Sequence, residues 1–169
     1  VGQSCYSSPI WIDGRLYGIS KHGEVIVLAA SKEFKELGRV DLDEKTFATP
    51  AIANGVMYFV GSRNVVRAVS ITTGKILWRY DPKVADIAGD RMRVSFLYGS
   101  RGLALWKDKV YVATVDGRLI GIDTKTGEEV WSVMTVDPDK ALYITGAPKA
   151  FKGKVLIGNG GTENGPTRG

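Results

Sequence analysis

Few residues of this chain have the types and spacing that catalysis or metal binding requires. His22 is the only histidine and falls in an expected hairpin turn, without neighbouring partners for catalysis or for a metal. Cys5 is the only cysteine, which excludes an internal disulfide and a thiolate metal cage. The glycine-rich run at 158–161 follows an expected strand but precedes no helix, so the helix terminus of a phosphate site is missing.

Charge and hydropathy narrow the classes of partner further. The net charge is +5, yet basic and acidic residues are interleaved, as in the run at 32–36, so we expect a solvated surface and no nucleic-acid partner. The longest uncharged apolar stretch, at 25–30, is far shorter than the roughly 20 residues of a membrane span. No export leader opens the sequence, so the chain is either cytosolic or lacks a leader that was removed or never included.

Four segments share one pattern, in which an apolar strand and a tight turn precede a second strand. These segments cover residues 9–17, 51–58, 103–111 and 148–156. Asp13-Gly14 and Asn54-Gly55 tolerate positive φ at both turn positions, which a type I′ hairpin requires. Aligning the four hairpins on Tyr17, Tyr58, Tyr111 and Leu156 gives spacings of 41, 53 and 45 residues. Propeller blades of four strands repeat at about 40–50 residues, so the spacing favours a propeller.

Further turns at His22-Gly23 and Asp116-Gly117 add a third strand to two of these hairpins. Apolar residues dominate both faces of these third strands, as expected for a sheet that lies between two others. Apart from an ambiguous stretch at 31–37, no segment has a sustained helical period. We therefore predict an all-β fold, a partial β-propeller of about 3.5–4 four-stranded antiparallel blades. The expected blades are 8–46, 47–82, 101–138 and an incomplete 146–169, with an insert at 83–100.

Two eleven-residue segments, 68–78 and 121–131, match position for position and end in Trp78 and Trp131. Each contains a Thr-Gly turn at the same offset, and the glycine can take positive φ there. The pair resembles the tryptophan-docking motif of propellers of the pyrroloquinoline-quinone (PQQ) type. We expect both indoles to be buried between blades.

From about residue 65 the chain resembles the PQQ-dependent (quinoprotein) alcohol dehydrogenases. The resemblance rests on the order and spacing of segments 131–137, 144–148 and 158–163. Residues 1–64 instead resemble repeats of non-enzymatic PQQ-like propellers, through Ser7-Ser8-Pro9-Ile10 and the segment 47–52. A join near 60–67 suggests the hypothesis of a recombined or artificial chain.

The resemblance implies a partial site for PQQ and calcium. Arg101 would hydrogen-bond the quinone oxygens, since a guanidinium offers fixed paired donors. Thr145 would contact a cofactor carboxylate, and Glu163 would bind calcium, which prefers oxygen ligands. The loop that lies against the cofactor would contain Gly160, Gly161 and Thr162.

The sequence also departs from the family pattern. Ser95-Phe96 stands where the family has an adjacent cysteine pair, although Phe96 could stack on a flat ring. The catalytic aspartate belongs to later blades, so we expect no turnover of an alcohol substrate by this chain alone. Both residues also have an alternative role without a cofactor. Arg101 would pair with Asp90 or cap a strand end, and Glu163 would be a solvated residue of the C-terminal tail.

Two classes of function remain open. The first is a fragment of a periplasmic quinoprotein dehydrogenase that keeps part of its cofactor site. The second is a cofactor-free repeat scaffold for protein contacts. In either case the incomplete fourth blade predicts a homo-oligomer formed through the first and fourth units, because an unpaired strand edge templates pairing.

Overall fold

The computed structural model describes residues 4–89, 99–140 and 142–161, which form three four-stranded antiparallel sheets and one two-stranded sheet. The first sheet contains β1 (Ile10–Ile12), β2 (Arg15–Ile19), β3 (Glu24–Ala29) and β4 (Glu36–Asp41). The second contains β5 (Ala51–Ala53), β6 (Val56–Val60), β7 (Val66–Ser70) and β8 (Ile76–Tyr80). The third contains β9 (Leu103–Trp106), β10 (Lys109–Ala113), β11 (Arg118–Asp123) and β12 (Glu129–Met134), and the fourth contains β13 (Lys149–Phe151) and β14 (Lys154–Leu156).

The first hairpin of each sheet has the same register, as the sequence alignment predicted. The four aligned positions each lie opposite the residue seven places earlier: Ile10 and Tyr17, Ala51 and Tyr58, Ala104 and Tyr111, Lys149 and Leu156. Asp13 and Gly14 have φ values of 48° and 73°, and Asn54 and Gly55 have 51° and 74°. Both turns therefore have the positive φ of a type I′ hairpin.

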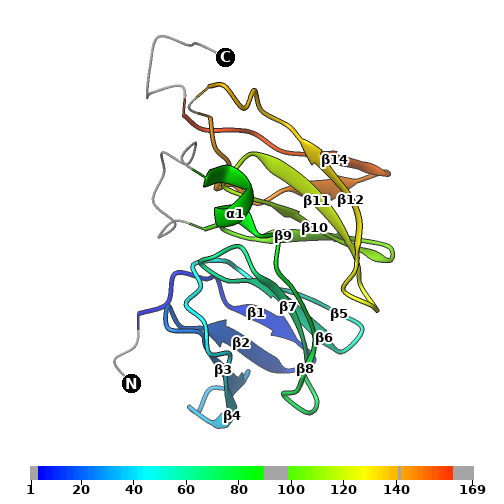
Figure 1. Ribbon diagram of the computed structural model, residues 1–169. Helices are drawn as coiled ribbons and strands as arrows, with labels where there is room; N and C mark the ends of the chain where they lie inside the picture. The colour runs from blue at the N-terminus through cyan, green and yellow to red at the C-terminus, as the bar shows by residue number, and fades with distance from the viewer. Residues whose placement is uncertain (1–3, 90–98, 141, 162–169) are drawn as a thin grey trace.

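The sheets stack in chain order, from β1–β4 to β13–β14, and the core lies between them (Figure 1). Tyr17, Ile19, Met57 and Phe59 pack between the first and second sheets. A larger cluster joins the second sheet to the third, and its fully buried members include Val60, Val112 and Ile120. Stacking of this kind buries both faces of the middle strands, which explains their continuous apolar runs. The prediction of an all-β propeller-type fold is confirmed.

One short helix interrupts the all-β pattern. α1 (Val84–Ala88) lies in the expected insert and buries Val84 and Ala88. The guanidinium of Arg118 donates a 2.7 Å hydrogen bond to the carbonyl of Pro82 just before this helix. The ambiguous stretch at 31–37 is not helical, and β4 already begins within it. Within the described ranges, no helix is long and apolar enough to cross a bilayer.

Trp78 and Trp131, which were expected to be buried between blades, pack against the clusters between the sheets but are only half-buried. They lie on β8 and β12, the last strands of their sheets. Trp78 nevertheless docks on the next sheet, since its Nε1–H donates a 2.9 Å hydrogen bond to the carbonyl of Thr124. A Cβ added to Gly127, whose φ is 75°, would lie 2.7 Å from the Trp78 ring, so only glycine permits this contact.

The tyrosines beside these indoles complete the sheet interfaces. Tyr58 contacts Trp78 with ring centroids 5.8 Å apart, and Tyr111 contacts Trp131 at the same separation. Burial between the sheets, together with the charge of Asp123, raises the pKa of Tyr58. The phenol therefore stays neutral and apolar in character at this interface.

Candidate functional site

The segments that lead into the first strand of each sheet lie side by side and are joined by hydrogen bonds. The backbone N–H of Ser8 donates to the Thr49 hydroxyl at 3.1 Å. The N–H of Thr49 donates to the Arg101 carbonyl at 3.0 Å, and the N–H of Arg101 donates to the Thr145 carbonyl at 2.9 Å. We call these four residues the cross-sheet ladder. It brings Arg101 and Thr145, two predicted site residues, into direct contact.

A pocket of about 420 Å³ lies beside this ladder and is lined by Tyr6, Phe47, Gly99 and Arg101. The rings of Tyr6 and Phe47 meet edge to face, with centroids 5.4 Å apart. Arg101 is exposed at this pocket, and none of the acidic side chains in the described ranges forms an ion pair with it. The alternative partner Asp90 lies outside the described residues. A guanidinium next to aromatic rings suits a flat ligand with negatively polarised oxygens.

The predicted glycine loop joins the same end of the sheets. Tyr143 and Gly160 form an antiparallel bridge, with backbone hydrogen bonds of 3.1 and 2.8 Å. A Cβ on Gly160 would lie 3.0 Å from the Tyr143 ring, so the bridge depends on close packing here. Gly161 follows directly and is buried. The other predicted site residues, Phe96, Thr162 and Glu163, lie outside the described residues.

Sequence reasoning missed Tyr6 and Phe47, although a signal was present. Each stands four residues before the first strand of its sheet, and the equivalent positions in the third and fourth sheets are Gly99 and Thr145. In three of the four cases a proline follows three residues later. Aligning the chain on these prolines would have placed both aromatic residues beside the predicted Thr145.

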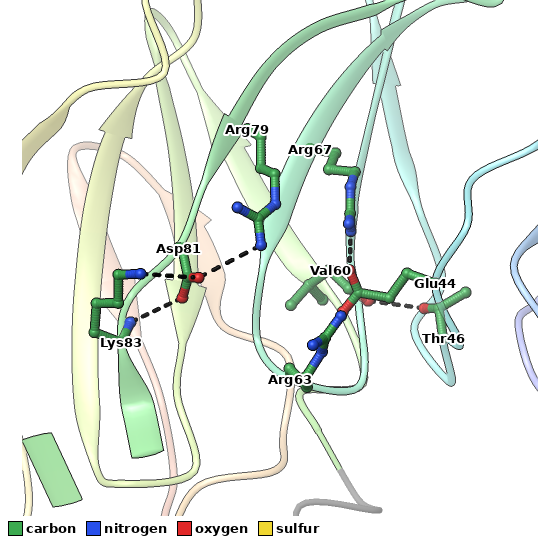
Figure 2. A network of polar contacts seen from close by, with 8 residues as sticks. All are labelled: Glu44, Thr46, Val60, Arg63, Arg67, Arg79, Asp81 and Lys83. Atoms are coloured by element: carbon green, nitrogen blue, oxygen red, sulfur yellow. Dashed lines mark hydrogen bonds and ion pairs between the residues drawn. The ribbon is translucent and has the colours of Figure 1, made fainter. Parts of the chain in front are cut away.

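A buried ion pair supports the segment that presents Phe47 (Figure 2). The carboxylate of Glu44, with a side chain 1% exposed, is hydrogen-bonded to the guanidinium of Arg67, which is 8% exposed. Arg63 approaches the other carboxylate oxygen to 3.9 Å. The Thr46 hydroxyl donates to the Val60 carbonyl at 2.8 Å and accepts from the N–H of Ala48. These contacts tie residues 44–48 to β6 and β7.

The described part of the chain holds no group of three His, Cys, Asp or Glu side chains with the spacing of a metal site. The donor set around the pocket consists of a guanidinium, two aromatic rings and backbone groups. This set fits a planar organic anion. Calcium prefers oxygen ligands, and the carboxylate predicted to bind it, Glu163, lies outside the described residues.

Comparison with known proteins agrees with the fold and with the repeat. A family model, PQQ_2, described as outer membrane protein assembly factor BamB, matches residues 7–163. The chain belongs to this PQQ-repeat family. The chain is 46% identical to the quinohemoprotein alcohol dehydrogenase ADH IIB of Pseudomonas putida, covering 92% of this chain and 23% of the relative. It is 45% identical to the 1-butanol dehydrogenase (cytochrome c) of Thauera butanivorans, covering 78% of this chain and 20% of the relative.

Two solved structures define the architecture. The quinohemoprotein alcohol dehydrogenase from Comamonas testosteroni matches with a TM-score of 0.61 and 49% identity, over 69% of this chain and 17% of that one. BamB from Moraxella catarrhalis matches with a TM-score of 0.71 over 92% of this chain and 44% of that one, at 18% identity, which shows the fold alone. The chain thus spans about a fifth of the length of its dehydrogenase relatives.

The similarity to ADH IIB covers 92% of the chain and so reaches well into residues 1–64, beyond the part in which the sequence resemblance was seen. The expected join at 60–67 lies in the regular connection between β6 and β7. There the N–H of Gly61 donates to the Val65 carbonyl at 2.9 Å, and the N–H of Asn64 donates to the Gly61 carbonyl at the same distance.

Proposed function

We propose that this chain forms one wall of the PQQ site of a periplasmic quinoprotein alcohol dehydrogenase. The observation that carries the proposal is the exposed guanidinium of Arg101, held by the cross-sheet ladder beside the rings of Tyr6 and Phe47. The high identity to quinohemoprotein alcohol dehydrogenases supports it. When bound, PQQ would supply the two-electron oxidation of the alcohol.

The residues of this chain would bind and orient the cofactor. Arg101 would donate hydrogen bonds to the quinone oxygens. The backbone hydrogen bonds of Arg101 to Thr49 and Thr145 fix the position of its main chain, from which the guanidinium extends. Phe47 and Tyr6 would exclude water from one edge of the ring, which strengthens those hydrogen bonds. The loop at Gly160 and Gly161 would let the backbone approach the cofactor closely. Proton removal from the alcohol would require a base from another part of the enzyme.

The proposal is tested by titrating PQQ into the chain and following absorbance and the melting temperature. A ligand at about 100 times its dissociation constant stabilises the native state by about 2.7 kcal/mol, so a clear rise in melting temperature is expected. Arg101→Leu should weaken PQQ binding by at least tenfold, because it removes charge-assisted bonds worth about 1.5–3 kcal/mol. Arg15→Leu, an equal change of charge at an exposed residue of β2, should leave the affinity unchanged.

No shift at saturating PQQ, or equal affinity of Arg101→Leu and the unsubstituted chain, would contradict the cofactor site. The cofactor-free scaffold would then be the better interpretation. Calcium is examined in the same titration: we propose Glu163 as its carboxylate ligand, so Glu163→Gln should remove any calcium-dependent gain in PQQ affinity.

We also propose that the chain self-associates through its fourth sheet. Phe151 on β13 is 49% exposed and Leu156 on β14 is 56% exposed. Among the described strands, β14 pairs only with β13, so its other edge is uncovered. An uncovered edge of this kind adds strands from another copy. Light scattering should show a mass that rises with concentration, and Leu156→Lys should suppress the rise. A constant monomer mass over a hundredfold concentration range would contradict this prediction.

A further inference from the structure

A pocket of about 410 Å³ lies between the first and second sheets. The first sheet leaves room here because Gly38 occupies the register position, just before a β-bulge, at which the second sheet has Trp78. A Cβ added to Gly38 would meet no atom within 4 Å. One side of the pocket is closed, since a Cβ added to Gly74 would lie only 3.0 Å from the Val40 side chain. The volume falls in the range of small-molecule sites, roughly 300–1,000 Å³.

Apolar and polar side chains both line this pocket. The apolar ones come from the two facing sheets and include Tyr17, Val27, Val40, Met57 and Val69. The polar ones are two arginines and three hydroxyl residues, Arg15, Arg39, Ser70, Thr72 and Thr73. Within the described part of the chain, no aspartate or glutamate lines the pocket. Apolar walls with a few hydrogen-bond donors and a positive charge suit a ligand that joins an anionic group to an apolar body.

The two arginines differ in whether their charge is already neutralised. The guanidinium of Arg39 binds Glu36 at 2.6 Å and Glu24 at 2.7 Å. None of the acidic side chains in the described ranges forms an ion pair with Arg15. Arg15 alternates with Tyr17 along β2, so both lie on the face that meets the second sheet. The charge of Arg15 is therefore available to an anion in the pocket.

The other sheets treat the position of Arg15 differently. The equivalent residue, the first of the second strand, is Val56 in the second sheet and Lys109 in the third. Val56 packs against the core cluster, and the ammonium of Lys109 pairs with Asp108 at 2.9 Å. The second sheet thus fills this position with an apolar side chain and the third neutralises its charge, whereas the first sheet keeps an unpaired cation beside a pocket.

Hydroxyl groups supply further donors to the same pocket. Tyr17 is 2% exposed, and no group in the described ranges forms a hydrogen bond with its hydroxyl. The hydroxyl oxygens of Ser70 and Thr73 already accept from the backbone N–H groups of Thr73 and Lys75, at 3.2 and 3.4 Å. Their O–H protons therefore remain to be donated. A carboxylate only accepts hydrogen bonds, so it matches a set of donors of this kind.

We propose that this pocket binds a small monocarboxylic acid with a branched apolar body. The guanidinium of Arg15 would bind the carboxylate, and the hydroxyl of Tyr17 would donate to it as well. The apolar body would lie against Val27, Met57 and Val69, which are contributed by both sheets.

This site is independent of the proposed cofactor site. The two pockets share no lining residue. The cross-sheet ladder lies where the first strand of each sheet begins, whereas Arg15 follows the turn at the other end of β1. Arg15→Leu is therefore expected to weaken binding of the acid and to leave PQQ affinity unchanged, so either proposal can fail without the other.

The test titrates isocaproate into the full chain, with calorimetry and methyl NMR as readouts. Isocaproate is expected to bind with a dissociation constant in roughly the millimolar range. Isocaproamide has the same shape without the charge and should bind about three- to tenfold more weakly, because water screens an exposed guanidinium. Acetate has the charge without the apolar body and should bind more than tenfold more weakly.

Arg15→Leu should weaken binding of isocaproate about three- to tenfold, to the level of the amide. Lys125→Leu, an equal change of charge at an exposed residue of the third sheet, should leave it unchanged. Shifts induced by isocaproate should centre on the methyl groups of Val27, Met57 and Val69, which locates the site without any substitution.

Shifts centred elsewhere, or no saturable binding of isocaproate, would overturn the proposal. Equal affinity for isocaproate and acetate would show an adventitious ion only and would overturn it too. Equal affinity for the acid and its amide, or an unchanged affinity of Arg15→Leu, would overturn the assignment of the carboxylate to Arg15.

Discussion

Arg67→Ala is expected to lower the free energy of unfolding by about 3–5 kcal/mol, because it leaves the buried carboxylate of Glu44 without its main partner. The Glu44 side chain is 1% exposed, and the remaining cation, Arg63, lies 3.9 Å away with a side chain 70% exposed. Such a contact does not replace the buried pair. Urea denaturation followed by tryptophan fluorescence measures the loss.

The double variant Glu44→Leu/Arg67→Met separates the missing partner from the missing packing. Replacing a buried ion pair by apolar residues of similar volume is often neutral or stabilising, so the double variant should be more stable than Arg67→Ala. A double variant at least as destabilised as the single one would show that the pair itself, and not the orphaned charge, stabilises residues 44–48.

Trp78→Ala is expected to cost about 3 kcal/mol, near the lower end for truncation of a large aromatic side chain. The indole is only half-buried, but it covers Gly127 and its N–H satisfies the Thr124 carbonyl of the next sheet. Thermal and urea unfolding should both report the loss, since the two sheets share one core cluster.

Trp78→Phe is the matched control, because it keeps an aromatic ring near Gly127 and removes the N–H donor together with the second ring of the indole. Its cost should be about 1 kcal/mol. Trp131→Ala provides a second comparison at the next interface, where the described residues offer the indole N–H no hydrogen-bond acceptor. A loss below about 1 kcal/mol for Trp78→Ala would contradict the docking interpretation.

Local signals made the fold predictable. Asp13-Gly14 and Asn54-Gly55 determined their turns by conformational preference, and the alternation of residues around them determined the register. The helix α1 was not foreseen, because five residues are too few to establish a helical period. The exposure of Trp78 was misjudged, since the repeat indicates which surfaces meet but not how much of an outer strand remains in water.

The candidate site was only partly predictable. Arg101 and Thr145 were found through resemblance, and the structure places them one hydrogen bond apart. The pair Glu44 and Arg67 was missed because the two residues are 23 positions apart and no local pattern marks a charge as buried.

The docking of Trp78 on Gly127 gives the contact between successive sheets a direction. This interface joins an indole on the outer strand of one sheet to a glycine turn of the next sheet, so the two contacting surfaces differ. An interface of this heterologous kind cannot close on itself about a two-fold axis. Units joined in this way continue head to tail, and the rotation from one sheet to the next decides whether the series closes into a ring or continues as an open helix.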